Sequence, residues 1–128
     1  MIVAIGVDLV ETRRIALSLE RFGSRLEHKL LTVAEQRADQ SAAQLSAYLS
    51  RQFAGKEAVS KVLGTGMRSG VHFRNIEILR DKTGAPSVNL IGAAKDRAKV
   101  LGIDRIHISL SDEKAYALAY AVGESLPD

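Results

Sequence analysis

One nonapeptide, residues 53–61, combines residue types and spacing that could do chemistry. It reads Phe-Ala-Gly-Lys-Glu-Ala-Val-Ser-Lys. On a helix of 3.6 residues per turn, four residues lie within about 60° of Glu57, namely Phe53, Ser60, Lys61 and Gly64. The apolar residues of the segment centre on the opposite side: Leu45, Tyr48, Val59, Val62 and Leu63. The spacing therefore predicts an exposed stripe that presents an acid and a base to a polyanionic ligand, directly or through a metal ion.

A second carboxylate, Asp8, directly follows the β-rich run Ile2–Val7. Asp8 and Glu57 both offer hard oxygen ligands, and Mg²⁺ is commonly held by one or two carboxylates plus substrate phosphates. A structural alternative exists for each residue. Asp8 could cap the following helix, with Glu11 completing a box-like pair. Glu57 and Lys61 could form a solvated i,i+4 pair worth a few tenths of a kcal/mol. Their sequence separation neither supports nor excludes a shared metal.

Three further patterns carry weaker signals. The segment 64–70 is glycine-rich, but it lacks the Gly-Lys-Ser/Thr ending of a P-loop and follows a helix. An anion there would need the loop's own N–H groups. His107 lies in a strand pattern, where a structural role is the commoner one. Ser109 and Ser111 have no histidine at a diagnostic spacing, so a hydrolase triad is poorly supported.

A basic stripe is predicted on the first helix. Ile15, Leu19, Phe22, Leu26 and Leu30 share one helical face. Another face gathers Arg14, Arg21, Arg25 and Lys29. Such a stripe is ordinarily just solvated. Here Leu17 lies among the cations while the acids Glu20 and Glu27 turn away, which favours an acidic protein partner.

The elements that must position these residues follow from periodicity and turn signals. In order we expect a strand at Ile2–Val7, a helix from Glu11 with a candidate break at Gly23, a helix opened by the Thr32–Glu35 capping box, a long helix at Ala43–Leu63 ended by Gly64–Gly66, a hairpin of Phe73–Arg80 and Ser87–Leu90, a helix at Ile91–Leu101, and a hairpin of Arg105–Leu110 and Ala115–Val122. This order predicts an α+β fold with a mostly antiparallel sheet.

Length and composition predict one globular domain over residues 1–128. Hydrophobic residues make up 46% and charged residues 26%, which are ordinary globular values. No apolar run approaches the ~20 residues of a membrane span, and no basic segment predicts a signal peptide. The absence of cysteine excludes disulfides and is compatible with a reducing cytoplasm, the location we expect. A net charge of +3 with few aromatic residues does not indicate a nucleic-acid binder.

Four motifs taken in order resemble a known family. They are Gly6-Val-Asp8 with Arg14-Ile15, Phe53-Ala-Gly-Lys-Glu57-Ala58 with Lys61, Gly84-Ala-Pro86, and His107-Ile-Ser109. The chain resembles, over essentially its whole length, the bacterial holo-[acyl-carrier-protein] synthases, the small type of 4′-phosphopantetheinyl transferase. The Asp8 block and the Lys-Glu-Ala block indicate this family only when they occur together; either block alone would not.

The resemblance implies the 4′-phosphopantetheinyl transferase fold and transfer of phosphopantetheine from coenzyme A to a serine of apo acyl carrier protein. Adenosine 3′,5′-bisphosphate would be released, and fatty acid biosynthesis served. Asp8 and Glu57 match the family's Mg²⁺ ligands, and Lys61 matches the lysine that contacts the pyrophosphate. These three residues would be catalytic. The general base stays open between Glu57 and a metal-bound water.

The resemblance also implies partners and further binding residues. Coenzyme A would be surrounded by Lys61, Gly64, Thr65, Gly66, Gly84, Pro86 and His107. Part of this set would come from a neighbouring subunit of a homotrimer, since the small type forms trimers with sites between chains. The acidic carrier protein would bind Arg14, Leu17, Arg21, Arg25 and Lys29. No membrane or nucleic-acid partner is implied.

Two positions depart from the family pattern. Many relatives have an arginine directly before the motif phenylalanine, whereas this chain has Gln52 there and Arg51 one residue earlier. A shift by one residue turns a helical side chain by 100°, so neither is assigned to the 3′-phosphate. After Ser109 the chain lacks the histidine of some relatives, and Asp112 and Glu113 are interpreted as turn residues.

The competing hypothesis is a non-catalytic module that docks acidic proteins through the first helix. Asp8 distinguishes the two hypotheses, because such a module has no use for a carboxylate at that place. Thermal stabilisation by coenzyme A that requires Mg²⁺ would be shown only by the enzyme.

Overall fold

The chain folds into five strands, four α-helices and two single 3₁₀ turns, and a computed structural model describes every residue from 1 to 128. The elements are β1 (Ile2–Glu11), α1 (Thr12–Phe22), α2 (Ser24–Leu30), η1 (Val33–Glu35), α3 (Ala42–Val62), η2 (Phe73–Asn75), β2 (Ile76–Arg80), β3 (Pro86–Leu90), α4 (Ala93–Leu101), β4 (Arg105–Asp112) and β5 (Tyr116–Glu124). None of the helices is long and apolar enough to cross a membrane.

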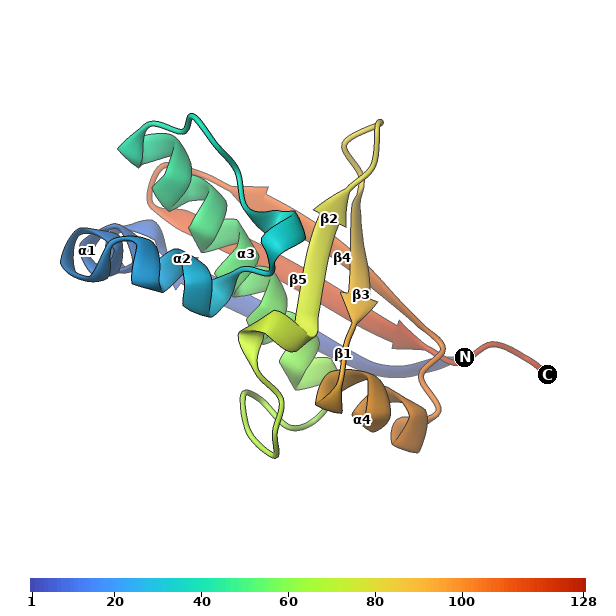
Figure 1. Cartoon of the computed structure of the whole chain (residues 1–128). Helices are drawn as coiled ribbons and strands as arrows, with labels where there is room; N and C mark the ends of the chain where they lie inside the picture. Colours follow the sequence, from blue (N-terminus) through green and yellow to red (C-terminus); the bar gives the residue numbers. More distant parts are fainter.

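The long helix α3 is the central element (Figure 1). On one side it packs against an antiparallel sheet with the strand order β1–β5–β4. On the other side it contacts α1, α2 and β2, which pairs antiparallel with β3. Every strand pair is antiparallel, which confirms the predicted α+β class.

Small residues allow the sheet to approach α3 closely. Ala117, Ala119 and Ala121 alternate along β5 and are fully buried. Gly6 in β1 has the closest approach, because a Cβ atom there would lie 2.1 Å from the carbonyl oxygen of Ala58. Real Cβ atoms essentially never show such a distance, so only glycine lets β1 pass α3 at this point. The residues that follow Gly6 in the strand are thereby brought to the helix.

The first strand is longer than predicted, and this corrects the place of Asp8. β1 continues to Glu11, and Asp8 pairs with Ala119 in the middle of the ladder. The capping alternative for Asp8 is wrong, because the residue before α1 is Glu11. The alternation of Leu9 and Val10 continues the strand pattern, since Val10 is buried and Leu9 faces outward.

Two predicted elements differ in kind. The capping box of Thr32 and Glu35 forms, but it opens a single 3₁₀ turn instead of a helix. The segment 73–75 is likewise a 3₁₀ turn, so the predicted strand begins only at Ile76. The predicted break at Gly23 is confirmed, with φ +57° between α1 and α2.

The predicted polar stripe of α3 is only partly exposed. Ser60 is fully buried, and its hydroxyl donates to the carbonyl of Glu57. The reason is that the sheet covers one side of α3 while α1, α2 and β2 cover much of the other. Phe53 and Glu57 are half-buried and Lys61 and Gly64 are exposed, so the acid and the base keep the predicted presentation.

Candidate active site

Asp8, Glu57 and Lys61 meet where β1 crosses α3. Successive side chains of a strand point to opposite faces, so Gly6 and Asp8 share the face toward the helix. The Lys61 ammonium donates to the carbonyl oxygen of Val7 at 2.7 Å and to the Asp8 carboxylate at 3.3 Å. The side chain of Asp8 is 17% exposed and that of Lys61 is 51% exposed. A carboxylate in a sheltered place is thus joined to a lysine that reaches solvent.

The electrostatics of Glu57 link it to Asp8. Burial raises the pKa of Glu57, the nearby charge of Asp8 raises it further, and Lys61 opposes both effects. Two carboxylates near each other are the arrangement that a divalent cation stabilises. No group of three or more metal-ligating side chains exists in the chain. A cation here would complete its shell with substrate and water oxygens, which is the usual environment of Mg²⁺.

A cavity of about 500 Å³ opens beside Glu57. Its lining residues are Val10, Arg14, Ile15, Leu17, Ser18, Leu26, Lys29, Leu30, Phe53, Glu57 and Phe73. Glu57 is the only acidic residue in this set. Arg14, Leu17 and Lys29 belong to the predicted carrier-protein face, so that face and the Glu57 carboxylate border the same cavity.

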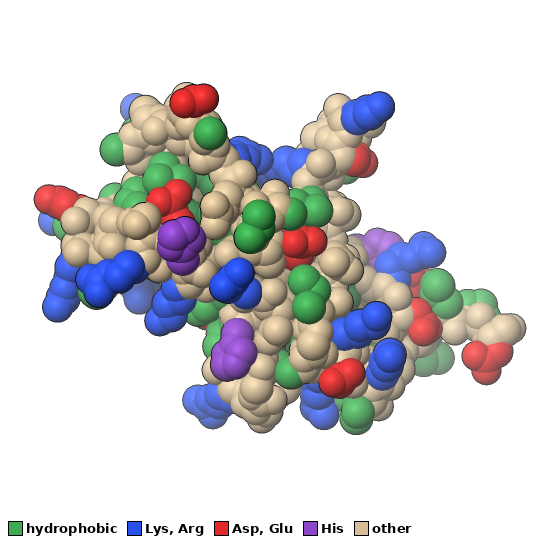
Figure 2. All heavy atoms as spheres, viewed as in Figure 1, with side chains coloured by type: hydrophobic (Ala, Val, Ile, Leu, Met, Phe, Trp, Pro, Cys, Tyr) green, Lys and Arg blue, Asp and Glu red, His purple; other side chains and the backbone are tan.

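The predicted carrier-protein face is exposed along α1 and α2, at Arg14, Leu17, Arg21, Arg25 and Lys29. Figure 2 shows Lys and Arg side chains gathered along the edge of these two helices. The guanidinium carbons of Arg21 and Arg25 lie 5.1 Å and 5.6 Å from the ring centre of Phe22. Phe22 was predicted on the apolar face and is 41% exposed instead. The break at Gly23 directly follows Phe22. The Phe22 ring forms the centre of a surface that is basic and partly apolar.

The glycine segment after α3 has its amide groups engaged. The N–H of Gly64 donates to the carbonyl of Lys61, and those of Thr65 and Gly66 donate to Ser60. The guanidinium of Arg97 in α4 caps the carbonyl of Leu63 at 2.9 Å. The segment is therefore a helix C-cap that offers exposed glycine backbone. The N–H groups of residues 64–66 are therefore not free for a phosphate.

The other residues predicted to surround coenzyme A lie apart in one chain. Gly84 lies in the β2–β3 turn and Pro86 is the first residue of β3. This turn projects at the opposite end of the view from the glycine segment after α3 (Figure 1). His107 lies on the outer face of the sheet, where its Nε2 is 3.0 Å from the Glu124 carboxylate. A single chain brings together the Asp8–Glu57–Lys61 group and leaves these residues separate.

Sequence inspection missed a buried polar network around Lys56, Glu35 and Gln52. All three side chains are almost completely inaccessible to solvent. Gln52 donates to Glu35 at 2.6 Å and to the carbonyl of Ile78 at 3.1 Å, so its amide faces the core rather than a ligand. The i,i+4 spacing of Gln52 and Lys56 is visible in the sequence. Their shared partner Glu35 was visible only as a capping-box residue.

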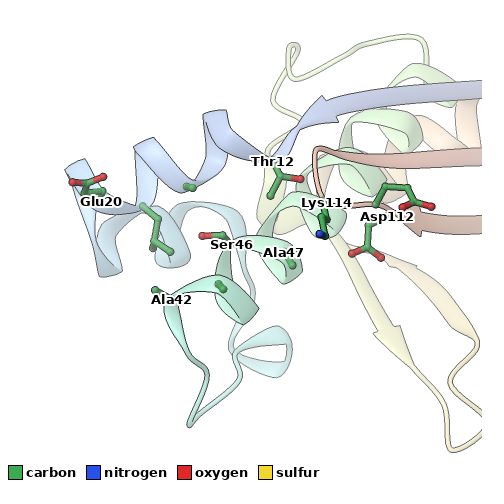
Figure 3. A pocket seen from close by; sticks show the side chains of 11 residues that line it. Thr12, Glu20, Ala42, Ser46, Ala47, Asp112 and Lys114 are labelled. Carbon is green, nitrogen blue, oxygen red and sulfur yellow. The ribbon is translucent and has the colours of Figure 1, made fainter.

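A larger pocket of about 1000 Å³ lies between α1, the start of α3 and the β4–β5 turn (Figure 3). Its lining includes none of the predicted site residues. Asp112 on its rim pairs with Arg51 at 3.2 Å. The amide of Glu113 donates to the carbonyl of Tyr116. The Asp112 carboxylate is thus engaged within the fold. Asp112 is the last residue of β4 and not a turn residue, because the strand continues further than the pattern indicated, whereas Glu113 lies in the β4–β5 turn as expected.

Comparisons with known proteins show the family to which the chain is similar. A family model described as the 4′-phosphopantetheinyl transferase superfamily matches residues 4–121. The chain is 42% identical over 122 residues to a holo-[acyl-carrier-protein] synthase of Halorhodospira halophila, covering 95% of this chain and 97% of that protein. It is 43% identical over 132 residues to that of Caulobacter vibrioides, covering 99% and 98%.

Solved structures are similar over nearly the whole chain. The holo-ACP-synthase of Plasmodium yoelii superposes with a TM-score of 0.87 at 35% identity, covering 99% of this chain and 98% of that chain. A holo-(acyl-carrier-protein) synthase of Bacillus anthracis in complex with CoA (3′,5′-ADP) gives a TM-score of 0.81 at 32% identity, with 98% and 99% covered.

Proposed function

The chain belongs to the 4′-phosphopantetheinyl transferase superfamily, among the holo-[acyl-carrier-protein] synthases, and from this premise we propose its reaction and its site. The enzyme transfers the phosphopantetheine arm of coenzyme A to a serine of apo acyl carrier protein and releases adenosine 3′,5′-bisphosphate. One observation carries the proposed site. Asp8, Glu57 and Lys61 meet beside the cavity that Arg14 and Lys29 of the carrier-protein face also line.

Asp8 and Glu57 are the residues that would hold Mg²⁺, because each is a carboxylate and the charge of one disfavours that of the other. A bound Mg²⁺ would neutralise the pyrophosphate of coenzyme A and make its phosphorus more electrophilic. Lys61 is exposed and lies beside Asp8, and its ammonium would donate to a phosphate oxygen of the substrate. The site therefore offers two carboxylates that could bind a metal cation, and one ammonium group that could bind a phosphate.

The chemical step is a displacement at phosphorus. The serine oxygen of the carrier forms a bond to the β-phosphorus, and the bond from that phosphorus to the bridging oxygen breaks, so adenosine 3′,5′-bisphosphate leaves. Positioning and charge stabilisation dominate such reactions. The serine proton must go to a base. Glu57, the only acid that lines the cavity, and a water molecule are the two candidates for this role.

The active assembly is proposed to be a homotrimer with coenzyme A between subunits. The outer face of the sheet exposes an apolar surface made by Val3, Ile5, Val7, Leu9, Tyr116, Leu118 and Tyr120. Exposed apolar areas of this kind mark interaction sites. A site that uses His107, Gly84 and the glycine segment 64–66 together also needs a second chain, since one chain keeps them apart. The glycines would contribute backbone packing against the nucleotide.

A cytoplasmic location and a role in fatty acid biosynthesis belong to the same proposal. The alternative of a non-catalytic docking module is less well supported. Such a module would not require Asp8 to lie on the inner face of β1 beside Glu57 and Lys61.

Mass spectrometry of an apo carrier protein tests the reaction directly. After incubation with the enzyme, coenzyme A and Mg²⁺, the carrier should gain the mass of one phosphopantetheine group. A carrier whose reactive serine is replaced by alanine is the matched control and should gain nothing. An unchanged wild-type carrier at saturating substrates would reject the proposed activity.

A further inference from the structure

A fully buried lysine lies one residue before Glu57. The Lys56 side chain has no exposure to solvent, although lysine is almost never fully buried unless it is paired. Its ammonium donates to three acceptors: the carbonyl of Leu30 at 2.5 Å, the carboxylate of Glu35 at 2.6 Å and the carbonyl of Phe73 at 3.0 Å. Lys56 thus uses all three of its protons on three separate segments of the chain.

Glu35 is the matching acceptor of this network. In addition to the Lys56 ammonium, its carboxylate accepts from the amides of Thr32 and Ile78 and from the side chain of Gln52. No buried side-chain nitrogen or oxygen in the chain lacks a partner. The pair therefore joins the end of α2, the turns η1 and η2, the strand β2 and the helix α3 in one network without an unsatisfied group.

The two carbonyls held by Lys56 belong to the walls of the site. Leu30 and Phe73 both line the cavity beside Glu57. Leu30 is the last residue of α2 and directly follows Lys29, which lines the same cavity from the carrier-protein face. Lys56 and Glu57 are consecutive in α3. One ammonium thus ties the docking helix and the η2 wall to the helix turn that carries Glu57.

We propose that Lys56 and Glu35 are positioning residues for the transfer, an inference that rests on the proposed function. They hold the carrier-protein face at a set distance from Glu57, so that the bound carrier presents its serine to the pyrophosphate. Stability alone does not account for such a pair, because replacing a buried ion pair with neutral residues of similar volume is often neutral or stabilising. In contrast, a misplacement of the reacting groups by about 1 Å can reduce the rate of the chemical step on the order of 10²-fold.

The double variant Lys56→Met/Glu35→Gln tests this role. It removes both charges together, so no buried charge is left alone, and the amide that replaces the Glu35 carboxylate keeps an oxygen acceptor for the N–H of Ile78. The carbonyls of Leu30 and Phe73 lose their common donor. We expect a folded protein whose kcat for carrier protein falls on the order of 10²-fold. Its Kd for coenzyme A with Mg²⁺, measured by calorimetry, should stay within about twofold, since Asp8, Glu57 and Lys61 remain.

Lys56→Gln/Glu35→Gln is the conservative second variant, because it also leaves no buried charge unpaired and its amide keeps two donors in place of the Lys56 ammonium. Its kcat should lie between those of the wild type and Lys56→Met/Glu35→Gln, and it replaces that variant in the test if that variant does not fold. Ile103→Ala is the matched control. Ile103 is buried beside Gly123 and does not line the cavity, so its loss should lower the melting temperature and leave kcat unchanged well below that temperature.

The outcomes separate the inference from the proposed function. Wild-type kcat in the folded Lys56→Met/Glu35→Gln variant, or in Lys56→Gln/Glu35→Gln if the former is unfolded, overturns the positioning role. An equal fall of kcat in Ile103→Ala also overturns it, because the effect would then follow stability. No transfer by the wild type in the same assay rejects the proposed function itself.

Discussion

At the level of single residues, the site depends on side chains whose charges are costly in their present surroundings. Glu57 is half-buried near Asp8, and both effects raise its pKa. The positive charge of Lys61 partly compensates the two negative charges, and the Lys61 side chain remains exposed. Such unfavourable pairing of like charges is expected where a cation or a polyanionic substrate is to be bound.

Replacing Glu57 by Gln should abolish transfer without unfolding the protein. The amide keeps the shape but is a poor ligand, and losing several kcal/mol of charge stabilisation lowers kcat on the order of 10³-fold or more. The melting temperature without Mg²⁺ should not fall, because a neutral group relieves the repulsion with Asp8. Asp8→Asn should also lose activity. Near-normal turnover of either variant at saturating Mg²⁺ would contradict the metal assignment.

Gly6→Ala tests the close approach of β1 to α3. The new methyl group would lie 2.1 Å from the carbonyl oxygen of Ala58, so strand and helix must separate. Overpacking of this kind costs about 1–3 kcal/mol in the free energy of unfolding. Chemical denaturation measures this loss. Gly84→Ala is a useful comparison, since it has open space around a positive φ and only local strain is expected. A Gly6→Ala protein of wild-type stability would show that the contact is not tight.

At the level of elements, α1 and α2 act as one surface although the backbone breaks at Gly23. The break lets the basic residues continue from Arg21 to Arg25 around the ring of Phe22. Exposed charge pairs are individually weak, about 0–1 kcal/mol. A surface of several such charges therefore acts mainly on the rate and orientation of encounter.

Reversing two charges, Arg14→Glu with Arg21→Glu, should raise the KM for carrier protein on the order of tenfold by the loss of two weak attractions and the gain of repulsion. The KM for coenzyme A should change little. The wild-type KM for carrier protein should also rise with ionic strength, because salt screens exposed charges.

The matched control is Lys95→Glu with Lys99→Glu, which makes the same change of net charge on the exposed face of α4. It should leave the KM for carrier protein near the wild-type value. If the reversal in α1 instead damaged coenzyme A binding and spared the carrier protein, α1 would not be the docking face.

At the level of the whole molecule, one face of the sheet is packed on α3 and the other is apolar and uncovered. An antiparallel sheet with one solvated face normally alternates apolar and polar residues. In β1 and β5 the outward positions are instead Ile5, Val7, Leu9, Leu118 and Tyr120. This face is the surface that the proposed trimer would bury.

Light scattering after size exclusion should report three times the 13.9 kDa mass of one chain. Leu118→Lys places a charge on the apolar sheet face and should shift the protein to monomers with reduced transfer. Val100→Lys is the control, because Val100 is 75% exposed on α4 and lies away from the sheet face. A Leu118→Lys variant that keeps the wild-type mass and activity would exclude this face as the interface.

The order of the elements and the candidate residues of the site could be predicted from the sequence by itself. Hydrophobic periodicity and turn residues depend on local geometry, so the α3 helix, both hairpins and the break at Gly23 could be predicted. The motif residues Asp8, Glu57 and Lys61 can be recognised from residue type and spacing alone. The basic stripe was also predictable, because residues three and four apart share a helix face.

Tertiary structure decided what local patterns cannot contain. The Asp8 side chain points toward α3 because β1 continues through this residue in its pairing with β5. Its approach to Lys61 depends on the missing Cβ atom of Gly6. The burial of Ser60 and the network of Lys56 with Glu35 arise where segments distant in sequence pack on α3. Periodicity shows which residues share a face, whereas only the packed fold shows what covers that face, because burial is a property of all the neighbouring segments together.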